Sequence, residues 1–379
     1  MKQQFKTNQE RASALGLKPA PTIKGYYWSE PEVDAVIDHN RKAEESRAFR
    51  GSASMPRLLT MFLDLTPSCN LRCPRLCYSD SEYVTERQRA TPGLSLAELK
   101  YCVDVAKAFG ANTIVTAGRG EPFLDPNALP LARYIGKKDM WWVVFTNCTR
   151  ITPRIARTLD QLNVSVVAKM NSLDPETQDR IVGVKGAQQA INKGVINLIG
   201  HGLWQPRLAV ESAIFREILD DLVDVFRYCR EMSITPYFEA LIETGKARKD
   251  LEWLAANRLT GTELTAFFKT LRAMDESEFG YTWTIPPGMR ILGYGSCRKN
   301  MTSVTIRPDG EVYTCVNDMD TRIGNMRIEK LDDLIVNSPI LRNLRLHGAA
   351  CCSVPCARIE NTSETDQGLV PLSISNLKK

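Results

Sequence analysis

Three cysteines stand close together in the segment CNLRCPRLCY, at residues 69–78. Cys69, Cys73 and Cys77 supply three thiols within nine residues, and no histidine lies near them. Three thiolates can hold a [4Fe–4S] cube and leave its fourth iron open to a substrate or cofactor. Zinc is the alternative, but a structural zinc site takes four ligands, usually from two short paired motifs. The spacing therefore favours an iron–sulfur site with one open iron.

The composition is that of a globular chain with an unusual supply of sulfur. The chain has 379 residues, 11 Cys, only 3 His and a net charge of +5. Hydrophobic residues make up 43%, which excludes wholesale disorder, and no apolar run approaches the roughly 18 residues that span a bilayer. The first residues lack the apolar stretch of a secretory signal, so we expect a cytoplasmic protein with reduced thiols. The weak charge indicates neither a membrane nor a nucleic-acid partner.

Apolar runs alternate with helical patterns along the middle of the chain, and these elements must position the cysteines. Periodicity predicts strands at 58–66, 112–118, 141–147, 164–172, 207–215 and 235–241. It predicts helices at 95–110, 128–138, 152–162 and 217–232, with a polar helical stretch after residue 172. This alternation is typical of an α/β fold with a parallel sheet buried on both faces. Ligands of such sheets bind at the carboxyl ends of the strands, and the cysteine segment directly follows the first strand.

Further elements are predicted on both sides of this region. A helix with Pro31 in its first turn precedes it. Residues 248–275 have a helical pattern, with Thr262 as a candidate N-cap. Residues 303–315 form a hairpin, and residues 331–346 form two helical pieces separated by a proline.

The cysteine segment after a first strand resembles that of the radical S-adenosylmethionine (SAM) superfamily. The resemblance implies a partial (β/α)6 TIM-like barrel and a cluster whose open iron chelates SAM. It also implies a 5′-deoxyadenosyl radical that removes a hydrogen atom from the substrate. The usual spacing in the superfamily is three residues and then two, whereas this chain has three in both gaps. Leu76 and Tyr78, on either side of the third cysteine, are the candidates for contact with the adenine.

Further motifs of the superfamily occur where the barrel predicts them. The segment AGRGEP (117–122) resembles a Gly-Gly-Glu motif that binds the SAM amino group, with Arg119 where the first glycine is usual. A carboxylate there can accept hydrogen bonds from an ammonium. With the polar residues after strands three and four, the resemblance implies that SAM is bound by Leu76, Tyr78, Gly120, Glu121, Pro122, Asn147, Lys169, Asn171 and Ser172.

The carboxyl-terminal cysteines resemble a SPASM/twitch module, which binds auxiliary clusters. A full SPASM module has seven cysteines and two clusters, whereas this chain offers five, as in the shorter twitch form with one [4Fe–4S] cluster. The implied ligands are Cys297, Cys315, Cys356 and either Cys351 or Cys352, of which we favour Cys352. A zinc ribbon is the alternative for these residues.

These observations divide the chain into five segments. The predicted segments are an N-terminal helical extension (1–57), a radical SAM partial barrel (58–247), a helical connector (248–296), a twitch auxiliary-cluster domain (297–357) and a tail (358–379). The cofactors implied are SAM and two [4Fe–4S] clusters, one that binds SAM and one auxiliary.

Three further residues are candidates for catalysis. Cys148 ends the third strand and could donate a hydrogen atom to a substrate radical, as a cysteine does in radical SAM epimerases. Glu211 and Glu239 lie on strands five and six, where a carboxylate pair would suit a cationic amino-sugar and could remove a proton. Salt-bridged or solvated glutamates are the alternative. Cys102 and Cys229 lie among apolar residues of helices and are interpreted as buried packing.

The resemblance favours an oxidoreductase or epimerase of antibiotic biosynthesis. A single auxiliary cluster is usual in enzymes that act on aminoglycosides, so we expect a sugar or aminocyclitol substrate. The reaction expected first is oxidation of an alcohol to a ketone, and epimerisation is the second. An external electron donor such as flavodoxin or ferredoxin is implied. The alternatives are a maturase of ribosomal peptides that epimerises or cross-links its substrate, and a non-catalytic iron–sulfur electron carrier.

Overall fold

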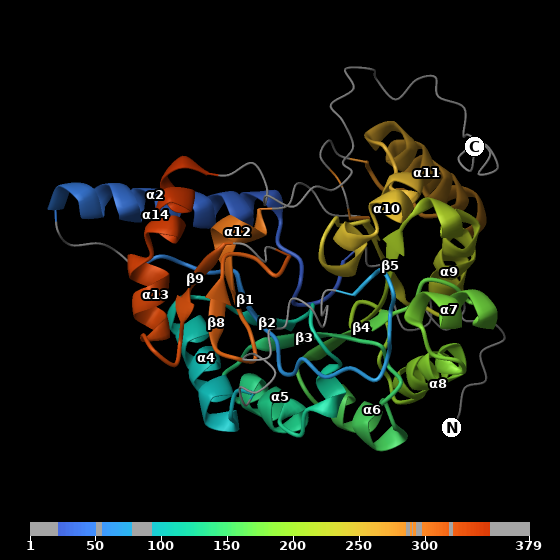
Figure 1. Cartoon of the computed structure of the whole chain (residues 1–379), viewed down its shortest axis with the longest axis horizontal. Helices are drawn as coiled ribbons and strands as arrows, with labels where there is room; N and C mark the ends of the chain where they lie inside the picture. The colour runs from blue at the N-terminus through green and yellow to red at the C-terminus, as the bar shows by residue number, and fades with distance from the viewer. Residues whose placement is uncertain are drawn as a thin grey trace.

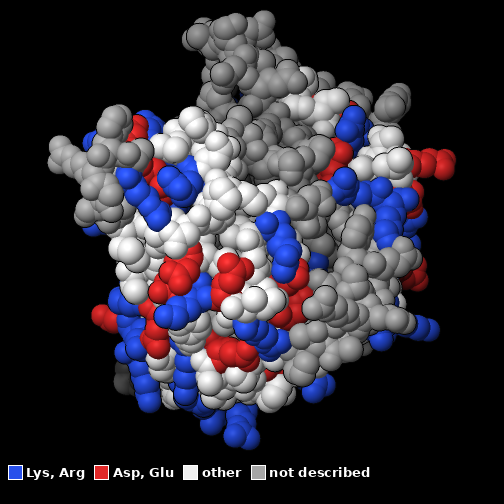
Figure 2. Space-filling view, turned by 60° about the vertical axis from the view of Figure 1, so that its left-hand side comes forward, with Lys and Arg blue, Asp and Glu red and all other residues white. Residues whose placement is uncertain are grey.

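A computed structural model describes residues 22–50, 55–77, 93–285, 289, 291–292, 298–317 and 321–348. The predictions for five residues lie outside the described residues: Tyr78, Cys297, Cys351, Cys352 and Cys356. Within the described ranges, we find no helix that is both long and apolar enough to cross a membrane. Figure 2 shows acidic and basic side chains interspersed over one face of the molecule.

The described residues form one nine-stranded sheet with the order β6-β5-β4-β3-β2-β1-β7-β8-β9 (Figure 1). The first six strands are β1 (Thr60–Leu63), β2 (Thr113–Thr116), β3 (Trp141–Thr146), β4 (Val164–Lys169), β5 (Leu208–Ile214) and β6 (Thr235–Ala240). Each pairs in parallel with the next, which confirms the predicted parallel sheet. Every strand is shorter than its predicted run, because the apolar residues continue into the loops at the strand ends.

Helices follow these strands and cover the outer face of the sheet (Figure 1). They are α4 (Leu96–Ala108), η1 (Pro122–Leu124), α5 (Ala128–Lys137), α6 (Pro153–Asp160), α7 (Pro175–Val182), α8 (Ala187–Gly200), η2 (Arg216–Ile218) and α9 (Leu219–Glu231). The residues that cap or open these helices lie at the helix starts in the sequence. Ser95 and Glu98 form a reciprocal capping box before α4, and Pro153 opens α6.

The carboxyl-terminal hairpin joins the same sheet. After α12 (Lys299–Thr302) come β7 (Ser303–Ile306), β8 (Glu311–Tyr313) and β9 (Arg322–Asn325), with antiparallel pairing from β7 to β9. The predicted hairpin is therefore confirmed. β7 also pairs in parallel with β1, so the second edge of β1 receives hydrogen bonds that an edge strand would leave unmade.

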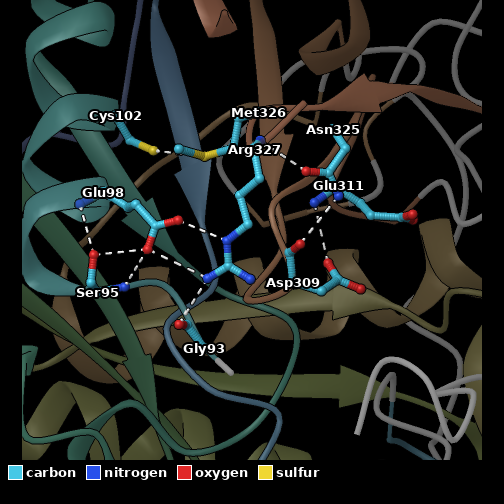
Figure 3. A network of polar contacts seen from close by, with 9 residues as sticks. All are labelled: Gly93, Ser95, Glu98, Cys102, Asp309, Glu311, Asn325, Met326 and Arg327. Atoms are coloured by element: carbon cyan, nitrogen blue, oxygen red, sulfur yellow. Dashed lines mark hydrogen bonds and ion pairs between the residues drawn. The ribbon is translucent and has the colours of Figure 1, made fainter. Parts of the chain in front are cut away.

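Arg327, just after β9, connects the hairpin to α4 through hydrogen bonds (Figure 3). Its Nε donates to Glu98 Oε1 over 2.7 Å, and its Nη2 donates to the carbonyl of Gly93 over 2.9 Å. Behind this pair, Cys102 Sγ lies 3.5 Å from Met326 Sδ. Cys102 is buried, in agreement with its interpretation as packing.

The interior of the barrel holds a second apolar cluster, which the N-terminal segment completes. Alternate residues of the strands point inward, and the ring of Tyr26 lies among them, 5.8 Å from Phe145 and 6.1 Å from Tyr237 between centroids. Gly25 turns the chain with φ +81°, where a Cβ would lie 2.7 Å from Trp141 Cβ. Residues 22–28 therefore close the amino-terminal end of the barrel, a role that the sequence did not indicate.

The remaining helices are α2 (Glu30–Arg50), η3 (Gly245–Lys249), α10 (Leu251–Asn257), α11 (Gly261–Met274), the π-helical turn η4 (Asp275–Phe279), α13 (Leu331–Asn337) and α14 (Pro339–His347). Pro339 opens α14, which confirms the predicted separation. The predicted N-cap Thr262 was wrong. Thr260 caps α11, because its side chain accepts from the N–H of Glu263 while that glutamate bonds back to Thr260.

Candidate functional site

A cavity opens at the carboxyl ends of the parallel strands. It has a volume of about 1150 Å³ with its open mouth included. The carboxyl ends of parallel strands are where the ligands of such sheets bind, so this cavity is the candidate site. The predicted site residues that line it are Cys69, Cys73, Leu76, Cys77, Gly120, Glu121, Asn147, Lys169, Asn171, Glu211 and Glu239.

The cysteine loop, residues 69–77, forms one wall of the cavity. Burial raises the pKa of Cys69, and it raises the pKa of Cys73 to about 12. Bound iron would displace these protons, because the thiolate is the ligand. No three ligand-type side chains of the described residues converge as around a single metal ion. Three partly buried thiols on one loop, all facing the cavity, are a donor set that fits three corners of an iron–sulfur cube.

The glycine-rich loop after β2 lies directly against the cysteine loop. Gly120 has φ +71°, and a Cβ on it would lie 2.0 Å from the carbonyl oxygen of Thr66. The N–H of Glu121 donates to the carbonyl of Ser68 over 2.8 Å. Only glycine permits this close approach, so the motif is explained by backbone contact as well as by ligand binding.

The buried carboxylate of Glu121 is already well supplied with donors. It accepts from Thr146 Oγ1 at 2.7 Å, from the N–H of Asn147 at 2.8 Å and from the N–H of Phe123 at 3.2 Å. Burial nevertheless raises the pKa of Glu121 above its usual value. A carboxylate has about four acceptor positions, so roughly one remains for a ligand in the cavity.

Asn147 links the end of β3 to the cysteine loop. Its Nδ2 lies 3.0 Å from Asn70 Oδ1 and 3.9 Å from Cys69 Sγ, and its Oδ1 accepts from the N–H of Thr149 at 3.0 Å. The N–H of Leu71 also donates to Cys69 Sγ, over 3.4 Å. A polar donor therefore lies next to the thiol, at a residue that the sequence analysis included among the SAM-binding residues.

Charged side chains of β4, β5 and β6 form a second wall of the cavity. Lys169 Nζ forms an ion pair with Glu211, and Lys169 also lies 5.7 Å from the centroid of the Phe145 ring. Burial raises the pKa of Glu211, Lys169 opposes that shift, and the neighbouring Glu239 adds to it. This wall thus presents two carboxylates and one ammonium, because alternate residues of the strands point inward.

Among the described residues predicted for SAM binding or catalysis, three do not line the cavity. Cys148 is 1% exposed and packs in the outer core, with its carbonyl against Gly194. Pro122 is buried at the start of η1. Ser172 donates to Asp221, and its N–H donates to a side-chain oxygen of Gln178. The sequence placed all three after the right strands, but the side-chain directions in the loops follow no simple period.

Two family models match the chain. Residues 63–234 match the model described as the radical SAM superfamily, and residues 297–357 match SPASM, described as an iron–sulfur cluster-binding domain. The chain thus contains a radical SAM domain and a SPASM domain. These two domains imply SAM and two [4Fe–4S] clusters as cofactors.

Individual relatives are distant. The chain is 28% identical over 228 residues to Fe-coproporphyrin III synthase of Methanosarcina barkeri, with 60% of this chain and 55% of that protein covered. It is 24% identical over 308 residues to the antilisterial bacteriocin subtilosin biosynthesis protein AlbA of Bacillus subtilis, with 80% and 65% covered. The chain thus spans less than two thirds of the length of either protein.

A solved structure gives the same fold. SuiB of Streptococcus suis, bound to its precursor peptide SuiA, matches with a TM-score of 0.62 at 14% identity, over 89% of this chain and 78% of SuiB.

The SPASM domain reaches the barrel interior through Cys315, its one predicted ligand within the described residues. Cys315 is buried in the cluster of inward-facing barrel residues. The next residue, Val316, has its carbonyl 3.4 Å from Arg307 Nη2 and would contact any Cβ added at Gly118.

Sequence reasoning missed a buried charge cluster at the carboxyl end of β1. Asp64 forms an ion pair with Arg307 at 3.5 Å, and the charge of Arg119 also acts on it. Burial raises the pKa of Asp64 to about 6 although both arginines oppose the shift. The inward alternation that continues from Phe62 would have pointed to this position. Arg119, where the superfamily usually has glycine, is therefore part of a buried network between the glycine-rich loop and β7.

Proposed function

We propose that this chain is a radical SAM enzyme that removes a hydrogen atom from a C–H bond of a peptide substrate. The cavity carries the proposal, since three thiols and two buried carboxylates line the same space. When bound, SAM and the reduced cluster supply a 5′-deoxyadenosyl radical, the agent of hydrogen abstraction. In the mechanism that we propose, residues of the chain itself bind the ligands and transfer the proton.

Different residues of the cavity wall would bind the cluster, bind SAM and exclude water. Cys69, Cys73 and Cys77 would hold the SAM-binding cluster, and Glu121 would accept a hydrogen bond from the SAM ammonium with its remaining acceptor position. Lys169 would contact the carboxylate or ribose of SAM. The inward-facing apolar residues below the cavity exclude water from that side, which protects a reactive species from side reactions.

The carboxylates favour a substrate with a cationic or hydrogen-bond-donating group. Lys169 balances the charge of Glu211, so the two carboxylates and one ammonium leave this part of the cavity with net negative charge, which would repel a carboxylate-bearing tetrapyrrole and attract an amine. Among the relatives, AlbA aligns over most of this chain and is named for bacteriocin biosynthesis. None of the three names reported above refers to a sugar, so the expected sugar or aminocyclitol substrate stays without support.

Glu211 and Glu239 are the catalytic residues that we propose. Burial raises the pKa of Glu211, so its ionised carboxylate would be a stronger base toward a substrate group than an exposed glutamate is. Glu239 would bind the cationic group. Cys148 lies outside the cavity, so the proposal gives it no part in hydrogen donation.

The test uses the full chain with both clusters reconstituted, a chemical reductant and SAM. We would measure methionine and 5′-deoxyadenosine with three probes: a synthetic lysine-containing peptide, its glutamate-containing analogue and an aminocyclitol. We expect the basic peptide to increase 5′-deoxyadenosine formation most, and Glu239→Gln to raise its KM about tenfold. The matched control is Glu243→Gln, four residues further along the chain, where the carboxylate does not line the cavity and pairs with Arg258. Failure of the wild-type chain to cleave SAM, or stimulation by the aminocyclitol alone, would refute the proposal.

A further inference from the structure

The second gap of the cysteine loop holds three residues, one more than the spacing usual in the superfamily. An additional residue gives a loop further conformations, and holding it in one of them costs conformational entropy. Leu76 in this gap lines the cavity and packs on the core. Arg75, next to it, makes its contacts with the segment that follows β6.

Arg75 is docked on the start of α10. Its Nε lies 3.0 Å from Asp250 Oδ2, and its guanidinium lies 5.5 Å from the centroid of the Trp253 ring. Asp250 is also the N-cap of α10, since its Oδ1 accepts from the N–H of Trp253 at 3.0 Å. The indole packs in turn on Phe215, with 5.5 Å between ring centroids. The partners of Arg75 are thus themselves fixed by the helix and by the loop after β5.

Lys246 binds both ends of the same gap. Its backbone N–H donates to the carbonyl of Cys77 over 3.1 Å, and its Nζ donates to the carbonyl of Cys73 over 3.2 Å. One residue therefore fixes the backbone at the two cysteines that bracket the additional residue.

The segment that makes these contacts is also a wall of the cavity. Its residue Ala247 is buried and lines the cavity beside the cysteine loop, and so does the buried Thr244, which directly precedes the segment. Within the described chain, residues 245–253 thus contact the thiol-bearing loop from one side and border the ligand space from the other.

We propose that residues 245–253 form a clamp that holds the longer Cys73–Cys77 gap in a cluster-binding shape. Arg75 and Lys246 are its positioning residues: neither ligates iron, and both act through the placement of the second and third thiols. The clamp replaces the restraint that a shorter gap would provide by itself. This inference rests on the proposed radical SAM function, because it concerns the cluster that binds SAM.

The test compares Arg75→Ala, Arg75→Lys and Lys246→Met with the wild-type chain, each reconstituted anaerobically with both clusters. The measurements are iron per chain, the EPR spectrum of the reduced protein with and without SAM, and the Kd of SAM from the spectral change. We expect Arg75→Ala to weaken SAM binding about tenfold and to broaden the EPR signal, with partial rescue in Arg75→Lys. Lys246→Met keeps the backbone N–H that donates to Cys77, so we expect it to weaken SAM binding only about threefold.

Two controls separate positioning from a general loss of structure. Arg258→Ala breaks an exposed ion pair with Glu243 in the same connector and should leave the EPR line shape and the SAM Kd unchanged. In the double variant Arg75→Ala/Trp253→Ala, the loss should not exceed that of the larger single change, since the two residues act as one contact. Wild-type spectra and SAM affinity in both Arg75→Ala and Lys246→Met would overturn the clamp. A wild-type chain whose cluster signal ignores SAM would instead overturn the proposed function.

Discussion

The pair Arg327–Glu98 joins the carboxyl-terminal hairpin to α4, and its removal gives a prediction with a defined size (Figure 3). The arginine side chain lowers the pKa of Glu98 from 4.5 to about 2, with the capping serine Ser95 as a further cause. A shift of that size corresponds to at most roughly 3.4 kcal/mol. The side chains are 26% and 31% exposed, so solvent screening reduces the value. We expect Arg327→Ala to lower the free energy of unfolding by about 1–2 kcal/mol.

The pH dependence follows from the direction of the shift. Because the pKa of Glu98 is lower in the folded state, its contribution is complete above about 4.5 and is lost as the pH falls toward about 2. The difference between wild type and Arg327→Ala should therefore be the same at pH 7 and pH 5, as measured by urea unfolding.

The matched control is Arg322→Ala, which removes a more exposed ion pair with Glu311 on the same hairpin. We expect this variant to lower the free energy of unfolding by less than about 1 kcal/mol. A difference for Arg327→Ala that is no larger than this control, or one that shrinks between pH 7 and pH 5, would refute the reasoning.

Three further predictions concern the interior. Gly120→Ala should prevent cluster assembly, because a Cβ would lie 2.0 Å from the carbonyl of Thr66; a wild-type iron content would contradict this. Tyr26→Ala should destabilise the barrel by about 3–5 kcal/mol, seen as a lower melting temperature, since its ring packs on three aromatic rings of the interior. An unchanged melting temperature would show that the N-terminal segment does not close the barrel. Cys148→Ala should leave product formation intact, because the thiol lies outside the cavity; loss of product in a stable variant would restore its role as hydrogen donor.

The candidate site was predictable in part. The residues of the strand ends, Lys169, Glu211 and Glu239, could be chosen because a period of two fixes which side of a strand a residue occupies. Cys148 and Ser172 could not be judged in this way, because they lie in loops where backbone turns decide the direction of the side chain. The unusual spacing of the cysteine loop was visible in the sequence, but the partners of Arg75 were not, since they are some 175 residues away along the chain.

The sequence alone therefore determined what depends on local pattern. The alternation of strands and helices, the helix caps and the grouping of three thiols after β1 all arise from residues close together in the chain. Only the tertiary structure decided the contacts between distant segments. Three such contacts are the pairing of β7 with β1, the closure of the barrel by Tyr26 and the hydrogen bonds of Lys246 to the cysteine loop. They depend on which backbone groups still lack a hydrogen-bond partner, and which apolar surfaces are still exposed, after local structure has formed. Many segments could meet such a need, and three-dimensional packing selects one of them.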